Sequence, residues 1–253
     1  SAGRPVVSPG RVLPWIVFFV LIALWQAASS AGLLPPLFMP SPAAVVRALV
    51  ELWLNGTLVE HITASLKRII PGWIIGTAAG LAVGLAMGIF SAARSAGLPV
   101  VSALFPIPKI ALLPLLILWF GIGEPSKVAT IALGVFFPTV ISAYSACDSV
   151  PRNLIRMGQS FGLPATDIVA KVILPGSMPG ILAGFRISAS VALLLVVAAE
   201  MIGAQYGIGA FVLAAGNLMQ TDQLMAGVVM LSVLGLLIAW GLGIVERSVL
   251  RWR

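Results

Sequence analysis

Charged residues are scarce in this chain. They make up 9% of its 253 residues, whereas hydrophobic residues make up 60%. Soluble globular domains carry about 25% charged residues, and so few charges cannot cover a surface of this size in water. The composition therefore excludes an ordinary water-soluble domain and indicates a protein embedded in a membrane.

Cysteine and histidine are also nearly missing. Cys147 is the single cysteine and His61 the single histidine, which excludes an intrachain disulfide and makes a zinc site a poor expectation. The phosphate-binding sequence Gly-x-x-x-x-Gly-Lys-Ser/Thr does not occur, so the chain is not expected to hydrolyse ATP by itself. We expect no catalytic residues, no metal and no cofactor on this chain.

The excess of positive charge has a pattern typical of membrane orientation. The net charge is +7, but the basic residues flank apolar runs and form no dense basic block. This placement argues against nucleic acid as a partner and for contact with membrane lipid.

Six apolar runs are long enough to cross a bilayer, for which about 20 residues are needed. Helices are expected, because every backbone polar group must be satisfied within lipid, and the alternation of a membrane β-barrel is missing. The predicted spans are residues 13–30, 69–90, 98–120, 128–147, 177–201 and 224–245. The sequence thus predicts an all-α membrane protein that forms a single transmembrane domain over residues 1–253.

The distribution of lysine and arginine sets the orientation. With the N-terminus in the cytoplasm, nine basic residues fall inside and four outside, which favours cytoplasmic termini (residues 1–12 and 246–253) and a cytoplasmic loop at 148–176. Those inside are Arg4, Arg11, Arg94, Arg152, Arg156, Lys171, Arg247, Arg251 and Arg253; those outside are Arg47, Lys67, Arg68 and Lys127.

Amphipathic helices are expected on the outer side. Ser41 can cap a helix with Pro42 in its first turn, followed by an apolar face of Val45, Leu49 and Leu52. A second helix over residues 58–68 leads into the second span. The glycine-rich segment 203–223 is too polar to span and predicts an outer loop with a short helix or a shallow re-entrant piece.

Glycine recurs at every fourth position in the second span. Because a four-residue step turns only about 40° around a helix, the glycines form one gently winding groove, which lets another helix approach closely in lipid. Packing inside one subunit and contact between subunits both remain open. The groove consists of Gly72, Gly76, Gly80, Gly84 and Gly88.

The third span contains prolines and a lysine. Pro106, Pro108 and Pro114 should kink or break the helix, and Lys109 has 14 uncharged residues on each side, which places it near mid-membrane. An ionisable residue at that depth is a candidate for the translocation path, and Lys109 with Pro108 is assigned to it. The alternative is a lysine paired with a carboxylate or with carbonyls that the prolines free.

The fifth span carries Arg186 and Glu200. They are 14 residues apart, or about 21 Å along a helix, so they cannot pair on one straight helix. Arg186 is expected to extend toward the cytoplasm, and Glu200 to close the path or meet water near the outer end. Both are assigned to the translocation path, with a structural role as the alternative.

The loop at 148–176 predicts two short helices. Ser149 can cap the first, with Pro151 in its first turn, and an apolar face recurs at helical spacing. Gly162 should stop this helix; Pro164 should start the second, which Leu174 and Pro175 should end. The exposed face suits a partner's groove or a lipid surface. Its apolar residues are Leu154, Met157 and Phe161.

The same loop resembles the cytoplasmic "EAA" loop of ABC-importer permeases. The shared pattern is Gly162, a gap of nine residues, then Val172-Ile173-Leu174-Pro175. Further similarity to the nitrate, sulfonate and taurine branch of that family lies in residues 34–38, 40–42, 61–68, 115–124, 126–127, 136–138, 184–186 and 198–200. The match covers nearly the whole chain.

This resemblance implies the fold of a type I ABC importer permease with a cytoplasmic coupling helix. The implied partners are a second copy of the permease, two ATP-binding subunits that hold ATP and Mg, and a periplasmic or lipid-anchored solute-binding protein in a bacterial inner membrane. The solute would be a small, sulfonate-, taurine- or nitrate-like anion. Docking of the ATPase would use Leu154, Arg156, Met157, Gly158, Phe161, Gly162, Leu163, Pro164 and Ala165.

The chain departs from the family pattern in one informative place. The usual Glu-Ala-Ala triplet is Arg156-Met157-Gly158, so a contact made by that glutamate cannot be carried over. A secondary transporter working without an ATPase is the alternative function, although it would usually need buried carboxylates for ion coupling, and only Glu200 lies within a span. An intramembrane enzyme would need a nucleophile with a base, or a set of metal ligands, and the single histidine lies outside the predicted spans.

Overall fold

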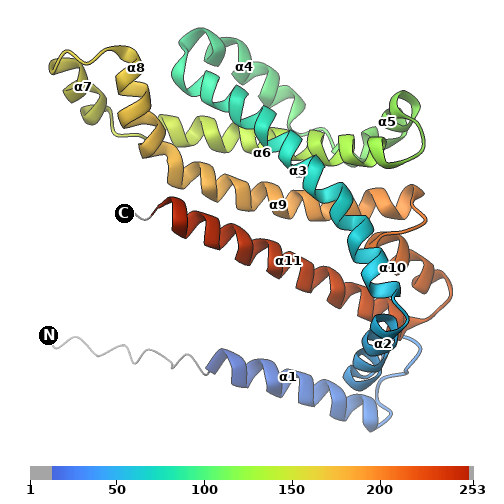
Figure 1. Cartoon of the computed structure of the whole chain (residues 1–253). Helices are drawn as coiled ribbons and strands as arrows, with labels where there is room; N and C mark the ends of the chain where they lie inside the picture. Colours follow the sequence, from blue (N-terminus) through green and yellow to red (C-terminus); the bar gives the residue numbers. More distant parts are fainter. Residues whose placement is uncertain (1–12, 251–253) are drawn as a thin grey trace, which may run out of the picture. The chain divides into compact units, whose positions relative to one another are not determined.

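A computed structural model describes residues 13–250, and the regular structure of these residues is helical (Figure 1). Five stretches are long and apolar enough to cross a membrane, and a bent pair of helices is a sixth. The prediction of an all-α membrane protein with about six spans is confirmed. The five are α1 (Leu13–Ser30), α3 (Thr57–Ile89), α6 (Glu124–Asp148), α9 (Leu174–Gly203, extended back to Ala165) and α11 (Thr221–Val249).

The described chain forms two compact units. Unit 1 takes the described residues up to Val59 together with Phe211–Val229, and unit 2 takes Glu60–Ala210 together with the described residues from Met230 onward. The expected cytoplasmic N-terminus, residues 1–12, and the end of the expected C-terminal segment lie outside the described residues.

Unit 1 contains α1 and the first amphipathic helix, α2 (Pro42–Leu54). The hydroxyl of Ser41 accepts a hydrogen bond from the Ala44 amide at 3.2 Å, so the predicted cap is present. Val45 and Leu52 are buried and Arg47 is exposed, which gives α2 the two faces that its sequence predicts. The second helix predicted for the outer side is the first part of α3, and the loop after α9 contains α10 (Ile208–Asn217).

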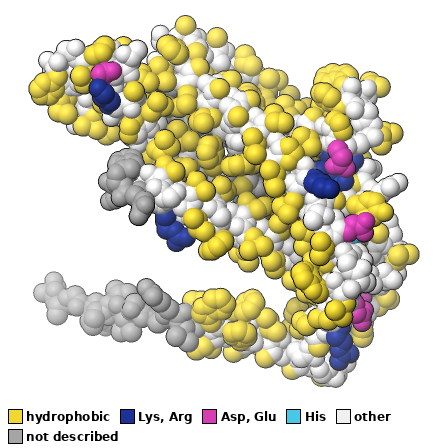
Figure 2. Space-filling view, viewed as in Figure 1, with side chains coloured by type: hydrophobic (Ala, Val, Ile, Leu, Met, Phe, Trp, Pro, Cys, Tyr) yellow, Lys and Arg dark blue, Asp and Glu magenta, His cyan; other side chains and the backbone are white. Residues whose placement is uncertain are grey.

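Unit 2 is organised around α6. Ile131, Val135 and Val140 on this helix are fully buried, and its most extensive packing is against α9. Charged side chains are confined to a few clusters, whereas hydrophobic side chains cover most of the visible surface (Figure 2). This exposed apolar surface is what a helix bundle presents to lipid.

The glycine groove of α3 holds α6 of the same chain. A Cβ on Gly80 would lie 2.6 Å from the Phe136 carbonyl oxygen, and one on Gly84 would lie 2.6 Å from that of Val140. Gly72, Gly76 and Gly88 face Ile131, Ala132 and Cys147 in the same way. The groove therefore serves packing within one subunit, the first of the two alternatives.

A second row of glycines, which sequence reasoning missed, meets the same helix from α9. A Cβ on Gly180 would lie 2.7 Å from the Ala146 Cβ, and one on Gly184 would meet Ser142; Gly176 faces Val150, just after the end of α6. Glycines on α3 and α9 thus allow the backbones of both helices to approach the backbone of α6 closely.

The third predicted span is broken, as its prolines predict. The chain forms α4 (Ser91–Leu104), a short 3-10 helix η1 (Lys109–Leu112) and α5 (Leu113–Phe120), with a bend of 84° between the two arms. Broken backbone at membrane depth requires partners within the protein, and Lys109 supplies them.

The loop at 148–176, which is predicted to be cytoplasmic, departs from the predicted structure at both ends. Ser149 does not cap α7 (Arg152–Ser160); it ends α6, where its hydroxyl donates to the Ala146 carbonyl at 2.8 Å, because the free carbonyls of that last turn are nearer. Leu174 and Pro175 do not end the second helix. The chain stays helical from Ala165 to Gly203 through α8 (Ala165–Ile168) and the π turn η2 (Val169–Ile173), and Pro175 lies in the first turn of α9, where it needs no donor.

Candidate functional site

The short helix α7 presents an apolar face that nothing in the described chain covers. Leu154 is 41% exposed, Met157 is 53% exposed and Phe161 is 79% exposed. These residues lie at three- and four-residue spacing on one side of the helix. Isolated exposed apolar residues are normal, but two on this nine-residue helix and a third at its C-cap, Phe161, form one surface suited to a partner.

A glycine fixes the end of α7. Gly162 has a φ of 73°, a left-handed conformation that favours glycine. Its N–H donates to the Gln159 carbonyl at 3.0 Å, and the Leu163 N–H donates to that of Gly158 at 3.1 Å. These two bonds form the Schellman motif that closes helices, so the predicted helix stop is present and Phe161 is held directly before the turn.

The remaining residues of the predicted docking set shape the loop. Gly158 is buried, and a Cβ there would lie 3.3 Å from Ile168, so α7 and α8 pack closely at this point. Pro164 directly precedes α8, and Ala165 is the first residue of that helix. Arg156 is exposed on α7. Because α8 continues through η2 into α9, a displacement of α7 would be transmitted into a membrane-spanning helix.

A cluster of charged side chains lies at the other end of unit 2, in which Arg68 and Glu200 are buried and Glu124 is exposed. From Leu174, α9 runs 30 residues, or about 45 Å, away from the α7–α8 loop. At its far end Arg68 of α3 donates to both oxygens of Glu124 at 2.6 Å each, and to Glu200 at 2.7 Å. The guanidinium also donates to the Tyr206 carbonyl at 2.6 Å. One arginine therefore joins α3, α6, α9 and the loop that follows α9.

Glu200 is part of this cluster and does not meet water. Its carboxylate accepts hydrogen bonds from the Ser65 hydroxyl at 2.8 and 3.0 Å and from the Gly209 amide at 2.9 Å, in addition to Arg68. The residue is 1% exposed. Nearby, the His61 ring contacts the Gly207 backbone at 2.9 Å. The expectation that Glu200 simply meets solvent is wrong, because three groups of the protein, Arg68, Ser65 and the Gly209 amide, bind its carboxylate.

Lys109 holds the broken span together. Its ammonium donates to the carbonyls of Leu104, Ile107 and Phe105 at 2.6, 2.7 and 3.2 Å. It also lies 4.4 Å from the centre of the Phe137 ring. All three donors of the ammonium are used, which matches the alternative of a lysine paired with freed carbonyls. Solute contact by Lys109 and Pro108 stays a prediction.

Replacing Lys109 by methionine should lower the stability of the permease. The change leaves carbonyls at the end of α4 without a donor, at a cost of about 1–3 kcal/mol. We expect a lower Tm of the purified protein, with partial recovery in Lys109→Arg, which keeps the charge. An unchanged Tm together with lost solute uptake would instead place Lys109 in the translocation path.

Arg186 has a partner within unit 2. It forms an ion pair with Glu246 of α11, and a pocket beside this pair is also lined by Trp240, Gly243 and Arg247. The prediction that Arg186 and Glu200 cannot pair with each other is confirmed, since each has another partner. A role for Arg186 in the translocation path stays a prediction.

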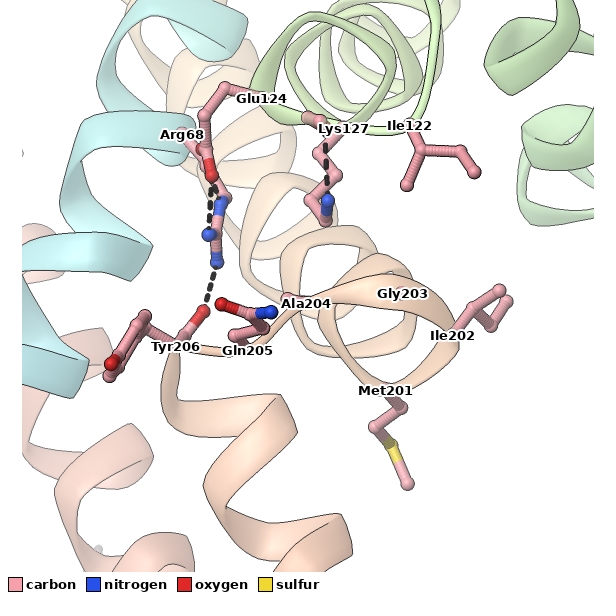
Figure 3. A pocket seen from close by; sticks show the side chains of 11 residues that line it. Arg68, Ile122, Glu124, Lys127, Met201, Ile202, Gly203, Ala204, Gln205 and Tyr206 are labelled. Carbon is pink, nitrogen blue, oxygen red and sulfur yellow. Dashed lines mark hydrogen bonds and ion pairs between the residues drawn. The ribbon is translucent and has the colours of Figure 1, made fainter.

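A pocket of about 510 Å³ opens beside the charge cluster (Figure 3). Arg68, Glu124 and Lys127 line it together with the two residues before α6, the end of α9 and the residues that follow α9. Sequence reasoning placed Arg68 and Lys127 only as outer flanking charges and did not bring them together. The signal was their position at the ends of apolar runs, where a buried charge must find a partner.

Comparison with known protein families, sequences and structures places this chain among transport proteins. The family model described as "Binding-protein-dependent transport system inner membrane component" matches residues 76–251. The chain belongs to this family. It is the permease component of an ABC importer, a membrane protein that is not itself catalytic.

Two relatives from Escherichia coli (strain K12) are similar over nearly their whole length. The putative aliphatic sulfonates transport permease protein SsuC is 38% identical over 96% of this chain and 92% of its own. The taurine transport system permease protein TauC is 36% identical over 92% and 86%. The riboflavin transport system permease protein RibX of Chloroflexus aurantiacus is 32% identical over 96% and 91%.

A solved structure shows the same fold. An inward-facing structure of the MetNI methionine ABC transporter has a chain with a TM-score of 0.68 at 21% identity, over 78% of this chain and 97% of that one. The predicted permease fold is thereby confirmed.

Proposed function

We propose that this permease imports small organic anions of the sulfonate type, which include taurine and aliphatic sulfonates. Of the relatives described above, the two with the higher sequence identity, 38% and 36%, carry those names. The translocating unit would be two copies of this chain with two ATP-binding subunits that hold ATP and Mg²⁺. An extracytoplasmic solute-binding protein would deliver the anion to a bacterial inner membrane.

The apolar face of α7 is the observation that carries the mechanism. Leu154 and Met157 on α7 and Phe161 at its C-cap are exposed, and Gly162 fixes the end of this helix. Such a face suits a hydrophobic groove on the ATP-binding subunit. The α7–α8 loop and both termini would then lie in the cytoplasm, and the Arg68 cluster on the outer side.

Alternating access follows from the continuity of the helix behind this loop. ATP closes the pair of ATP-binding subunits and draws the two α7 helices together. The motion passes through α8 and η2 into α9, since these form one helical stretch from Ala165 to Gly203. The spans thereby change from inward-open to outward-open, and the binding protein releases its solute into the open path.

The alternative of a secondary transporter gains no support from the buried carboxylate. Ion coupling needs a carboxylate that can exchange its cation or proton. Glu200 is held by Arg68, Ser65 and the Gly209 amide, so its charge is already compensated within the protein.

The substrate class is tested by competition. In proteoliposomes with the cognate ATP-binding subunit and binding protein, radiolabelled taurine should be taken up, and an excess of an aliphatic sulfonate should suppress that uptake. Riboflavin should not compete. Uptake of riboflavin with no uptake of either sulfonate would place this chain with a different branch of the family.

A further inference from the structure

Lys127 is a buried lysine with few hydrogen-bond acceptors around its ammonium group. It lies on α6, is 5% exposed, and donates to the Gly123 carbonyl at 2.9 Å. An ammonium group has three N–H donors. Two of them therefore have no hydrogen-bond acceptor within residues 13–250.

The neighbouring carboxylates do not supply those acceptors. Both oxygens of Glu124 accept from Arg68, and both oxygens of Glu200 accept from Ser65, with Arg68 and the Gly209 amide as further donors. Within the described chain no carboxylate lies at ion-pair distance from Lys127, whereas Arg68 pairs with both. A buried charge without a close partner costs several kcal/mol and marks a functional position in a membrane protein.

The contrast with Lys109 shows that this chain does satisfy lysines that serve its fold. Lys109 donates to three carbonyls, while Lys127 donates to one. The difference indicates that the two remaining N–H donors of the Lys127 ammonium bind a group that is not part of this chain.

The pocket in front of Lys127 has a polar side and an apolar side. Gln205 provides a polar amide on one side, next to the backbone of Ala204 and Tyr206 (Figure 3). Ile122 and Ile202 provide an apolar side and are themselves 86% and 56% exposed. The space of about 510 Å³ matches a small organic molecule with one charged end.

We propose that this pocket is a solute site on the permease, in which Lys127 binds the anionic head of the organic sulfonate and the Ile122 and Ile202 side holds its aliphatic part. The site rests on the proposed function. A sulfonate carries its charge on three oxygens, each of which accepts hydrogen bonds, so it can use both remaining donors of the ammonium and the amide of Gln205. In the proposed orientation the pocket lies on the outer side, where the binding protein releases solute.

The first test removes the charge. Lys127→Met in the complete permease–ATPase complex should weaken binding of radiolabelled taurine by at least about tenfold. It should lower the maximal uptake rate at saturating loaded binding protein to a similar extent. Lys67→Met is the matched control, because Lys67 lies beside Arg68 in sequence but is exposed; it should leave binding and uptake as in the wild type.

A second variant decides the question if Lys127→Met fails to assemble. Gln205 is exposed, so Gln205→Glu should fold normally while placing a negative charge in the pocket, and taurine binding should again fall by about tenfold. Gln220→Glu makes the same change at an exposed position outside the pocket and should have no effect. Wild-type binding and uptake in Gln205→Glu, or in an assembled Lys127→Met complex, would overturn the site. A wild-type complex that takes up no sulfonate would instead overturn the proposed function on which the site rests.

Discussion

Replacing Phe161 by aspartate should detach the ATP-binding subunit from the permease. Phe161, the C-cap residue of α7, is 79% exposed, so the substitution leaves the core of the permease untouched. If the side chain fills a groove on the partner, the change removes a large apolar contact and introduces a charge there. Losses at such central aromatic positions are about 2–4 kcal/mol, which corresponds to about a hundredfold weaker assembly.

The measurement is co-purification of the ATP-binding subunit with tagged permease, followed by its titration against the purified permease. Gln159→Glu is the matched control, because it adds the same charge to an exposed position on the opposite side of α7 from the apolar face. Gln159→Glu should assemble as the wild type does. Full assembly of Phe161→Asp would show that the apolar face of α7 is not the docking surface and lies on lipid instead.

Replacing Gly80 by leucine should have the largest effect on stability. A Cβ at this position would already lie 2.6 Å from the Phe136 carbonyl oxygen and 2.8 Å from the Thr139 Cβ. Backbone cannot yield as a flexible side chain does, so α3 would separate from α6 at a cost of at least about 3 kcal/mol. We expect a low yield and a Tm lower by about 10 °C.

The control for this variant makes the same substitution where there is room. Gly241 of α11 has no atom within 4 Å of a built Cβ, so Gly241→Leu should keep the yield and the Tm of the wild type. Normal yield and an unchanged Tm for Gly80→Leu would contradict the close packing of α3 on α6. They would indicate that the glycine groove faces lipid.

Local features were predictable from the sequence. Apolar run length gave the spans, Ser41 with Pro42 gave the start of α2, and Gly162 gave the end of α7, because each depends on residues within one or two helical turns. The prolines around Lys109 correctly predicted a break, since backbone geometry alone requires it.

Two local predictions failed where more than one local solution existed. The Ser149 hydroxyl could serve either of two helix ends, and it bonds to the end of α6. Pro175 is compatible with a helix stop and with the first turn of a new helix. The π turn η2 before α9 allows the second solution, and nothing in the local sequence distinguishes the two.

The partners of the buried charges could not be predicted, because they are distant in sequence. Arg68 and Glu200 are 132 residues apart and lie on different helices. The sequence shows that each is a charge near the end of an apolar run, and hence that each needs a partner. Only the packing of α3, α6 and α9 determines which charges meet, and with it the pocket in front of Lys127.

The central claim is that this chain is the permease of an ATP-driven importer. Its most direct test is taurine uptake into proteoliposomes that contain the permease with its cognate ATP-binding subunit, with ATP supplied on the side of the α7–α8 loop and the loaded binding protein on the other. Uptake should require both the ATP and the binding protein. Taurine uptake by the permease alone, driven by an ion gradient without ATP, would contradict it.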